Sequence, residues 1–175
     1  MIWQVTEATN GQRLICLDPD MHQEFDCLIG KNGMIQAAEK REGDNASPIG
    51  VWPLRAVYYR PDRVARPVTA LPIIAITPEM GWCDDPADPA YNQLITRPYD
   101  ARHELMWRDD HLYDLVITLG YNDAPPVAMK GSAIFLHLRE PTTLYTAGCV
   151  AIHQDDFLAL VATATPDSAI QIGSD

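Results

Sequence analysis

Positive charge is scarce in this sequence. Its 175 residues include 13 Lys and Arg against 24 Asp and Glu, which gives a formal net charge of −11 at pH 7. Proteins that bind nucleic acid neutralise phosphates with clustered Lys and Arg, so this balance argues against a nucleic-acid partner. It also disfavours docking on an anionic membrane surface. A neutral or zwitterionic small molecule stays open as a ligand.

Long hydrophobic runs are absent as well. No apolar stretch approaches the roughly 20 residues that a membrane-spanning helix needs, so we expect no membrane span. The first residues, MIWQVTEATNGQRL, lack the basic start and the apolar run of a secretory signal. From these two absences we expect a cytoplasmic protein, or a periplasmic one if a leader has been removed.

The four cysteines carry no metal-site spacing. None of Cys16, Cys27, Cys83 and Cys149 belongs to a CxxC or Cys–His pattern typical of structural zinc. A chain of 175 residues with 47% hydrophobic content can also build a core without disulfides. We therefore expect free thiols, no metal and no cofactor.

What is present is a pattern of short strands with frequent turns. Asn10-Gly11, between two alternating runs, is a strong hairpin signal. The strand-like runs are residues 2–7, 12–17, 24–30, 50–59, 71–77, 113–119, 132–138 and 169–172. One helix is expected at residues 155–164, opened by two Asp residues and ended before Pro166. The expected fold is a single, mostly β domain over residues 1–175, largely antiparallel, a twisted sheet or sandwich with one or two short helices.

Residues 78–112 differ from the rest of the chain. Their run MGWCDDPADPAYN is rich in Pro, Asp and aromatic residues, which favours turns over regular elements. Loops of this length inside a compact domain are typically functional or disordered. Because the segment contains Trp and Tyr, we expect one long structured loop.

His137 and Cys149 are the pair that points to chemistry. Alternation in residues 132–138 places the aliphatic side chains on one face of a strand and His137 on the other. In the next strand Val150 and Ile152 form the aliphatic face, and Cys149 lies opposite them. If the two strands pair, the imidazole and the thiol share one side and lie within reach of each other.

Such a pair performs acyl transfer. A thiol with a pKa of about 8.5 is mostly protonated at pH 7 and needs an activator. A neighbouring imidazole accepts the proton and later returns it to the leaving amine. Gly148 leaves the backbone open beside the thiol, so amide N–H groups there can face a developing oxyanion. The alternative is a buried structural Cys and a structurally satisfied His.

The same residues carry a family resemblance. His137 followed by Thr146-Ala147-Gly148-Cys149-Val150 resembles the active-site signature of the YkuD-type L,D-transpeptidases, a His before a Ser/Thr-x-Gly-Cys-hydrophobic motif. Upstream, Lys40 to Asp44 and then Ser47-Pro48-Ile49-Gly50 look like the stretch that precedes the site in that family. The segments 81–86, 91–92 and 103–104 look like a divergent branch, so the resemblance covers roughly residues 40–160.

Two positions depart from the family pattern. Typical members carry an Arg two residues after the Cys, where this chain has Ala151. The interval from His137 to Cys149 is twelve residues, a few fewer than usual. The absent Arg leaves open which group anchors the substrate.

The resemblance implies a β-rich catalytic domain that acts on peptidoglycan stem peptides or muropeptides. Cys149 would attack the carbonyl that precedes the terminal D-alanine and release that residue from a thioester. With water as acceptor the enzyme is an L,D-carboxypeptidase, which shortens tetrapeptides to tripeptides during muropeptide recycling. With an amine acceptor it is an L,D-transpeptidase that forms cell-wall crosslinks. The apparent lack of a signal peptide favours water.

A further set of residues is available to bind the stem peptide. Its members are charged, aromatic or polar groups near the expected site, each with turn formation, solvation or packing as the alternative role. They are Arg41, Asp84, Asp85, Tyr91, Asn92, His103 and Thr146.

Other cysteine enzymes fit less well. Sortases also place a His before a Cys, but that His lies far upstream and a downstream Arg completes the site. NlpC/P60-type and papain-like peptidases place the Cys first, at the start of a helix, whereas here a strand follows Cys149. From another class, a non-catalytic peptidoglycan-binding module with a decayed site also remains open, with Ala151 as its best support.

Overall fold

The computed structural model, which describes residues 1–9 and 11–173, is mostly β, as the sequence predicts. Its strands are β1 (Ile2–Ala8), β2 (Gly11–Cys16), β3 (Glu24–Cys27), β4 (Met34–Gln36), β5 (Ser47–Tyr59), β6 (Ile73–Ala75), β7 (Met80–Cys83), β8 (Leu94–Thr96), β9 (His103–Leu105), β10 (Leu115–Leu119), β11 (Phe135–Leu138), β12 (Val150–Ile152) and β13 (Ala169–Ile172). The helix α1 spans Gln154–Thr163.

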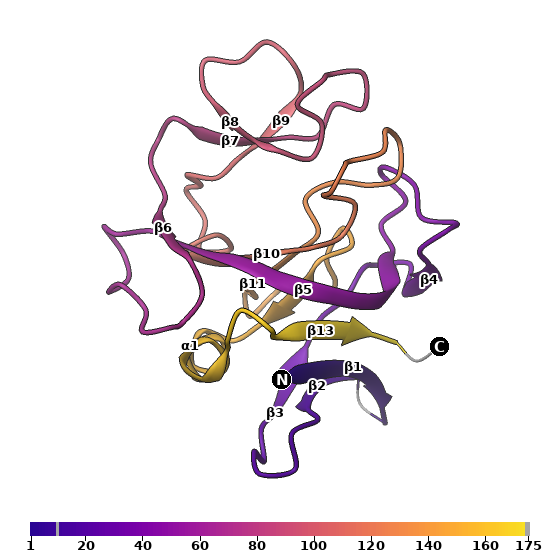
Figure 1. Cartoon of the computed structure of the whole chain (residues 1–175), viewed down its shortest axis with the longest axis vertical. Coiled ribbons are helices and arrows are strands. Elements are labelled where there is room, and N and C mark those ends of the chain that lie inside the picture. Colours follow the sequence, from indigo (N-terminus) through magenta and orange to yellow (C-terminus); the bar gives the residue numbers. More distant parts are fainter. Residues whose placement is uncertain (10, 174–175) are drawn as a thin grey trace.

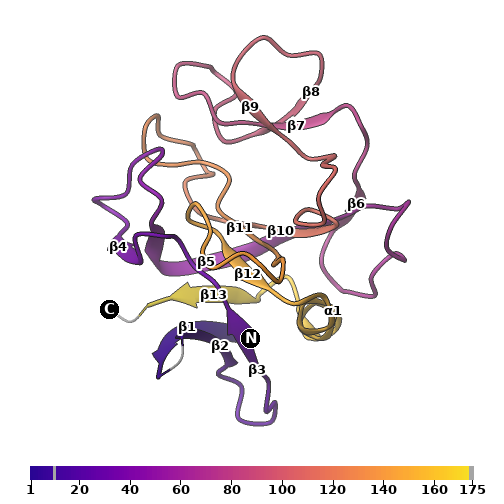
Figure 2. The same cartoon turned by 180° about the vertical axis from the view of Figure 1, so that it is seen from behind.

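The main sheet is nearly closed (Figures 1 and 2). Its strand order is β12-β11-β10-β5-β13-β1-β2-β3, with β4 and β6 paired to β5. An isolated bridge from Leu28 to Ala151 brings the region after β3 beside β12, the opposite end of that order. The chain segments before and after the sheet's long central strand β5 therefore meet around one interior.

That interior is filled by the alternating apolar side chains of the strands. Trp3 and Val5 of β1 and Leu14 of β2 are almost fully buried, and their neighbours face outward. Helix α1 buries Phe157, Leu160 and Val161, which share one helical face, into the same core. Each such side chain contributes about 1.5–3 kcal/mol by leaving water, so the alternation specifies which face of each strand turns inward.

Pairing is mostly antiparallel, as expected, with four exceptions. The pairs β1·β13, β4·β5, β5·β6 and β11·β12 are parallel. The hairpin β1–β2 is antiparallel, and Asn10 of its expected turn lies outside the described residues. The helix begins and ends one residue before its expected bounds.

Several expected strands are shorter or displaced. The runs 24–30, 71–77, 113–119 and 132–138 contain strands only at Glu24–Cys27, Ile73–Ala75, Leu115–Leu119 and Phe135–Leu138, whereas β5 starts three residues earlier than expected. Apolar side chains continue past these strand ends because the adjoining loops are buried too, as at Ile29 and Ile134. The alternating apolar pattern in the sequence is therefore longer than the hydrogen-bonded strand, and this is why the expected strands were too long.

The prediction of one long loop at 78–112 was wrong. A second sheet, ordered β8-β7-β9 and antiparallel, occupies this segment and lies above the main sheet in Figure 1. Its strands have three or four residues, too few for alternation to emerge from the Asp and Pro turns around them. A separate apolar cluster, which includes Tyr58, Val116 and Phe135 of the main sheet and Met106, packs on this side of the main sheet.

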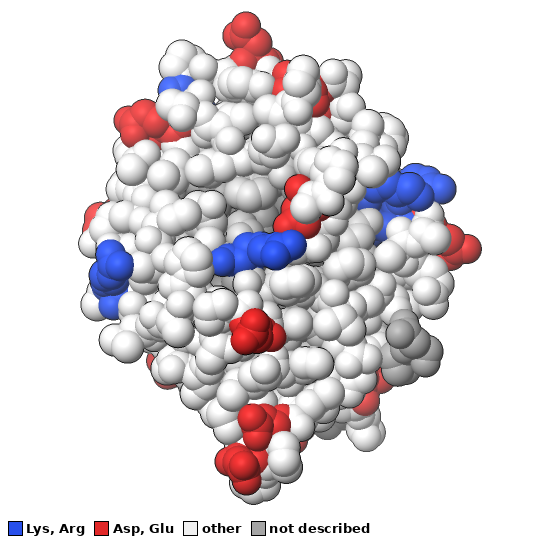
Figure 3. Space-filling view, viewed as in Figure 1, with Lys and Arg blue, Asp and Glu red and all other residues white. Residues whose placement is uncertain are grey.

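The four cysteines are free, as predicted, and the structure shows that all four are buried. Among the described residues no helix is long and apolar enough to span a bilayer. On the face drawn in Figure 3, acidic and basic side chains are spread in small groups, and uncharged residues occupy most of the surface.

Candidate active site

Strands β11 and β12 bring the expected pair onto one face. They run parallel, and His137 lies directly beside Ala151 in the register. Cys149 precedes Ala151 by two residues and therefore projects to the same side as His137. The opposite face, with Leu136, Val150 and Ile152, belongs to the main core. We call β11, β12 and residues 146–149 the floor of the site.

A cavity of about 490 Å³ lies over this floor, within the range of ordinary small-molecule sites. His137 and Cys149 both line it. Glu104, Arg108 and Leu112 contribute from residues 78–112, which we call the cover. The charged residues that line the whole cavity are Lys40, Glu42, Glu104, Arg108 and Arg139.

The thiol of Cys149 is buried and protonated. Its Sγ donates a hydrogen bond to the Ala133 carbonyl oxygen at 3.1 Å and accepts one from the Phe135 amide at 3.4 Å. Burial, and after it the nearby Glu104 carboxylate, raise the pKa of the Cys149 thiol to about 12. A proton acceptor is therefore required before this sulfur can act as a nucleophile.

His137 has one ring nitrogen available to accept a proton. Its Nδ1 lies 2.7 Å from the Leu138 carbonyl oxygen, which only accepts, so Nδ1 carries the proton and Nε2 keeps a free lone pair. Burial lowers the pKa of His137 to about 4. The Tyr113 ring meets the imidazole edge-on at 5.5 Å and limits its rotation. At neutral pH the imidazole is uncharged.

The loop before Cys149 is held by two hydroxyl groups. Thr146 Oγ1 donates to the Cys149 carbonyl at 2.7 Å and accepts the Gly148 amide at 3.0 Å. Ser47 Oγ donates to the Gly148 carbonyl at 2.8 Å. Gly148 has φ +138°, and a Cβ there would lie 2.9 Å from the Ala46 carbonyl oxygen, so only glycine fits.

Glu104 connects the cover to the floor. Its carboxylate accepts a 2.6 Å hydrogen bond from the Tyr113 hydroxyl, whose ring also packs on Phe135. Burial raises the pKa of Glu104. Arg108 stacks on Tyr113 at 4.9 Å and forms a two-point pair with Asp110. A carboxylate from the cover is thus placed beside the catalytic face.

Asn92 is buried, and all its polar groups are engaged by the protein. Its Oδ1 accepts hydrogen bonds from Trp82 Nε1 and the Ala133 amide, each at 2.9 Å. Its Nδ2 donates to the carbonyl oxygens of Tyr121 and Asn122. Because the Ala133 carbonyl holds the Cys149 thiol, Asn92 supports the site through the backbone and does not line the cavity.

Tyr91 also acts through a neighbour. Its hydroxyl donates to the Glu42 carboxylate, which accepts a second hydrogen bond from Ser132 Oγ at 2.8 Å. Glu42 and Ser132 line the cavity, whereas Tyr91 stands behind them. From the sequence, Glu42 is a candidate contact for the charged groups of the stem peptide, together with Arg41 and Asp44, with a solvated loop as the alternative.

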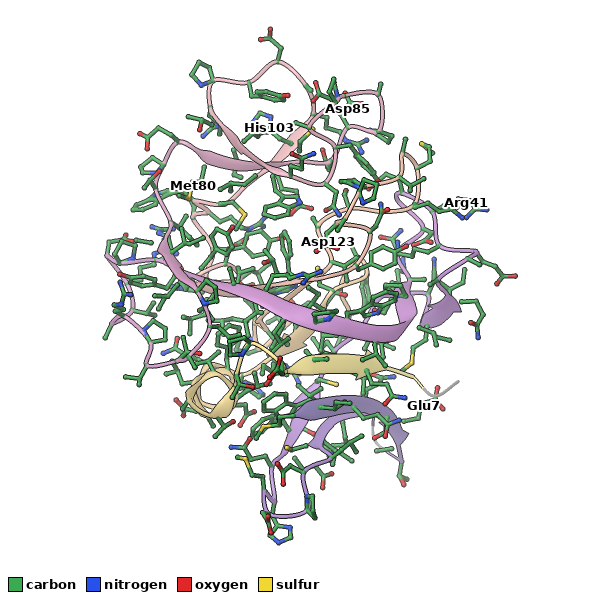
Figure 4. All side chains as sticks on the ribbon, viewed as in Figure 1. Glu7, Arg41, Met80, Asp85, His103 and Asp123 are labelled. Carbon is green, nitrogen blue, oxygen red and sulfur yellow. The ribbon has the colours of Figure 1, made fainter. Side chains whose placement is uncertain are left out.

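The remaining candidates from the sequence differ in whether they line the cavity. Thr146 lines the cavity, but Arg41, Asp84, Asp85 and His103 do not. Arg41 points away from the molecule, and Asp85 and His103 lie on the second sheet and its loops (Figure 4). Asp84 pairs with Arg102 at 3.0 Å, and Asp85 accepts the Ala87 amide within its own turn.

Ser47, Glu104 and Arg139 lie at the candidate site but were not among the site residues predicted from the sequence, although Ser47 and Glu104 belong to segments that carry the family resemblance. Arg139 follows His137 by two residues, so alternation alone was a usable signal for it. Ser47 and Glu104 come from segments 102 and 45 residues away from Cys149, and only folding brings them to it.

Comparison with known proteins agrees with this geometry. The family model of the YkuD L,D-transpeptidase catalytic domain matches residues 5–172, nearly the whole chain. No curated protein matches the chain. The chain therefore belongs to the L,D-transpeptidase catalytic-domain family, whose members carry out cysteine-dependent acyl transfer on peptidoglycan.

Proposed function

We propose that this chain is an L,D-carboxypeptidase that removes the terminal D-alanine from a peptidoglycan stem tetrapeptide through a thioester on Cys149. The observation that carries the proposal is the floor itself: Cys149 and His137 share one face of a parallel strand pair and line one cavity. Family membership supplies the substrate class.

In the first half-reaction Cys149 Sγ attacks the carbonyl that precedes D-alanine. The thiol turns from the Ala133 oxygen, and its proton passes to His137 Nε2 as the sulfur–carbon bond forms. When the carbon–nitrogen bond breaks, His137 returns that proton to the leaving amine. Because the neutral thiol and imidazole are both buried, the proton moves during attack rather than in the resting enzyme.

The developing oxyanion needs a backbone donor. The Gly148 amide is occupied by Thr146 Oγ1. The Cys149 amide donates to no acceptor among residues 1–9 and 11–173, which leaves it for the oxyanion. Thr146 then contributes by keeping this amide in place through the Cys149 carbonyl.

In the second half-reaction water attacks the thioester, with His137 as base. A cavity of about 490 Å³ suits the end of one stem peptide, and water needs no second binding site. An amine acceptor from a second stem would instead produce a crosslink. The carboxylates of Glu42 and Glu104, supported by Tyr91 and Tyr113, are suited to the ammonium group of the third stem residue.

The test is incubation of the protein with a disaccharide-tetrapeptide, followed by mass spectrometry of the products. Loss of one alanine supports the proposal, whereas joined muropeptides identify a transpeptidase. Cys149→Ser should lower the rate at least about 1,000-fold because an unactivated hydroxyl is a far poorer nucleophile. Cys16→Ser, on β2, serves as the control. If the folded protein shows no turnover and Cys149 reacts with iodoacetamide no faster than Cys16, the proposal fails. That result would support the alternative, a non-catalytic module with a decayed site.

A further inference from the structure

Three cations line the cavity, and two of them are already paired. Lys40 Nζ lies 2.7 Å from Asp44 Oδ1, and the Arg108 guanidinium holds Asp110 at 2.8 and 2.6 Å. Arg139 differs. Its Nε is buried with no hydrogen-bond partner, and its guanidinium forms no ion pair within the described part of the chain. Arg139 as a whole is partly exposed, so a buried Nε donor without a partner sits on a side chain that can still meet an anion in the cavity. Leaving such a donor unpaired is costly, which favours an anionic ligand.

The position of Arg139 relates it directly to the reacting groups. Its amide donates to the Ile152 carbonyl at 2.9 Å, so the pairing of β11 with β12 continues through this residue. Arg139 therefore projects to the same face as His137, about 6.6 Å further along the strand. Ala151, beside His137 in the register, also lines the cavity and has only a methyl group to fill the space.

We propose that Arg139 binds the carboxylate of the terminal residue of the substrate, the residue released in the reaction. This inference deepens the proposed function and rests on it for the identity of the substrate. Arg139 directly follows β11, the strand that pairs with the one after Cys149.

The order of groups along the strand agrees with the order of groups in the substrate. His137 must reach the nitrogen of the leaving residue to return its proton, so that nitrogen lies at His137. The carboxylate of the same residue is only two bonds further on, and Arg139 is the next side chain on the face. A planar guanidinium binds a carboxylate through two hydrogen bonds, which fixes the peptide direction across the floor.

The direct test compares a tetrapeptide ending in D-alanine with the same peptide ending in D-alanine amide. Wild-type kcat/KM should be about 10- to 100-fold higher for the free acid. Arg139→Gln should lose that preference by slowing only the acid, and Arg139→Lys should restore part of it through its point charge. Arg66→Gln, an exposed Arg outside the cavity lining, should keep the wild-type preference. A loss in Arg139→Gln that is equal for both peptides overturns the proposal.

A second readout does not require stem-peptide turnover. Cys149 is alkylated with iodoacetate, an anion, and with iodoacetamide, its neutral analogue, and the modified peptide is quantified by mass spectrometry. If Arg139 attracts a carboxylate next to the thiol, Arg139→Gln should lower the ratio of the two rates about fivefold, with no change in Arg66→Gln. An unchanged ratio overturns the proposal. Absence of turnover with an altered ratio instead counts against the stem-peptide substrate and leaves the carboxylate site standing.

Discussion

The floor and the cover of the cavity are built by different forces. The floor rests on a core of aliphatic side chains, and its two strands expose the reacting groups on the opposite face. The cover has strands of only three or four residues and packs on the main sheet through a smaller apolar cluster that includes Met106. Polar contacts of Asn92, Asp84 and Glu104 add to this attachment. Strand register positions His137 and Cys149 in the floor, whereas the cover depends more on individual hydrogen bonds added to a small apolar cluster.

This difference separates effects on chemistry from effects on stability. Hydrophobic burial is spread over many residues, so the floor tolerates changes on its open face without unfolding. A polar contact is local, and its loss leaves a specific buried donor or acceptor unpaired. Substitutions on the floor should therefore act on rate, whereas substitutions that remove a buried polar contact in the cover should act first on folding.

The largest expected effect is that of His137→Gln on turnover. Removal of the base should lower kcat for D-alanine release about 1,000-fold while the protein melts near the wild-type temperature at pH 7. In the wild type, the acid limb of kcat/KM should lie near pH 4, because the pKa of His137 is lowered to about 4. An acid limb near pH 6.5 would contradict the buried, neutral imidazole.

The lowered pKa of His137 also makes the free energy of unfolding depend on pH. Between pH 6.5 and pH 4 the unfolded chain protonates His137 and the folded chain does not, so stability rises with pH through this window. Between pH 6.5 and pH 4 the free energy of unfolding falls by about 3 kcal/mol from this one residue. His137→Gln should remove that part of the slope in urea unfolding at a series of pH values. Equal slopes in variant and wild type would refute the assignment.

Asn92→Ala should break the cover. The change leaves Trp82 Nε1 and the Ala133 amide without acceptors, which we expect to cost about 3 kcal/mol of unfolding free energy. Asn32→Ala, which removes one exposed hydrogen bond to the Asp44 carbonyl, should cost well under 1 kcal/mol. Urea unfolding measures both, and similar losses in the two variants would mean that the cover does not depend on Asn92.

Glu104→Gln, a change in the cover that acts on a group in the floor, should have the smallest effect of these substitutions. The amide keeps a partner for the Tyr113 hydroxyl but removes the charge that raises the pKa of Cys149. Alkylation of Cys149 by iodoacetamide at pH 8 should become about threefold faster, with stability nearly unchanged. Glu79→Gln, in an exposed turn before β7, is the matched control. Slower alkylation in Glu104→Gln would reverse the sign we assign to this carboxylate.

The sequence predicts the floor better than the cover for a physical reason. Alternation over β11 and β12 records which side chains avoid water, so the shared face of His137 and Cys149 is visible before folding. The parallel direction of that pair is not visible, because it depends on the path of the eleven residues, 139–149, that connect the two strands. In the cover, Pro and Asp indicate turns but do not say which turns bring short strands together.

By itself, the sequence determined the β-rich class and the shared face of His137 and Cys149, opposite the aliphatic side chains of their strands. These follow from local properties: side-chain period, residue type and motif. Only the tertiary structure decided that Ser47 holds the nucleophile loop, that Glu104 reaches the cavity from a second sheet, and that Arg139 alone among the cavity's described cations has no anion. Such facts depend on which distant groups become neighbours and which are left without one, and these are decided by the packing of the whole chain.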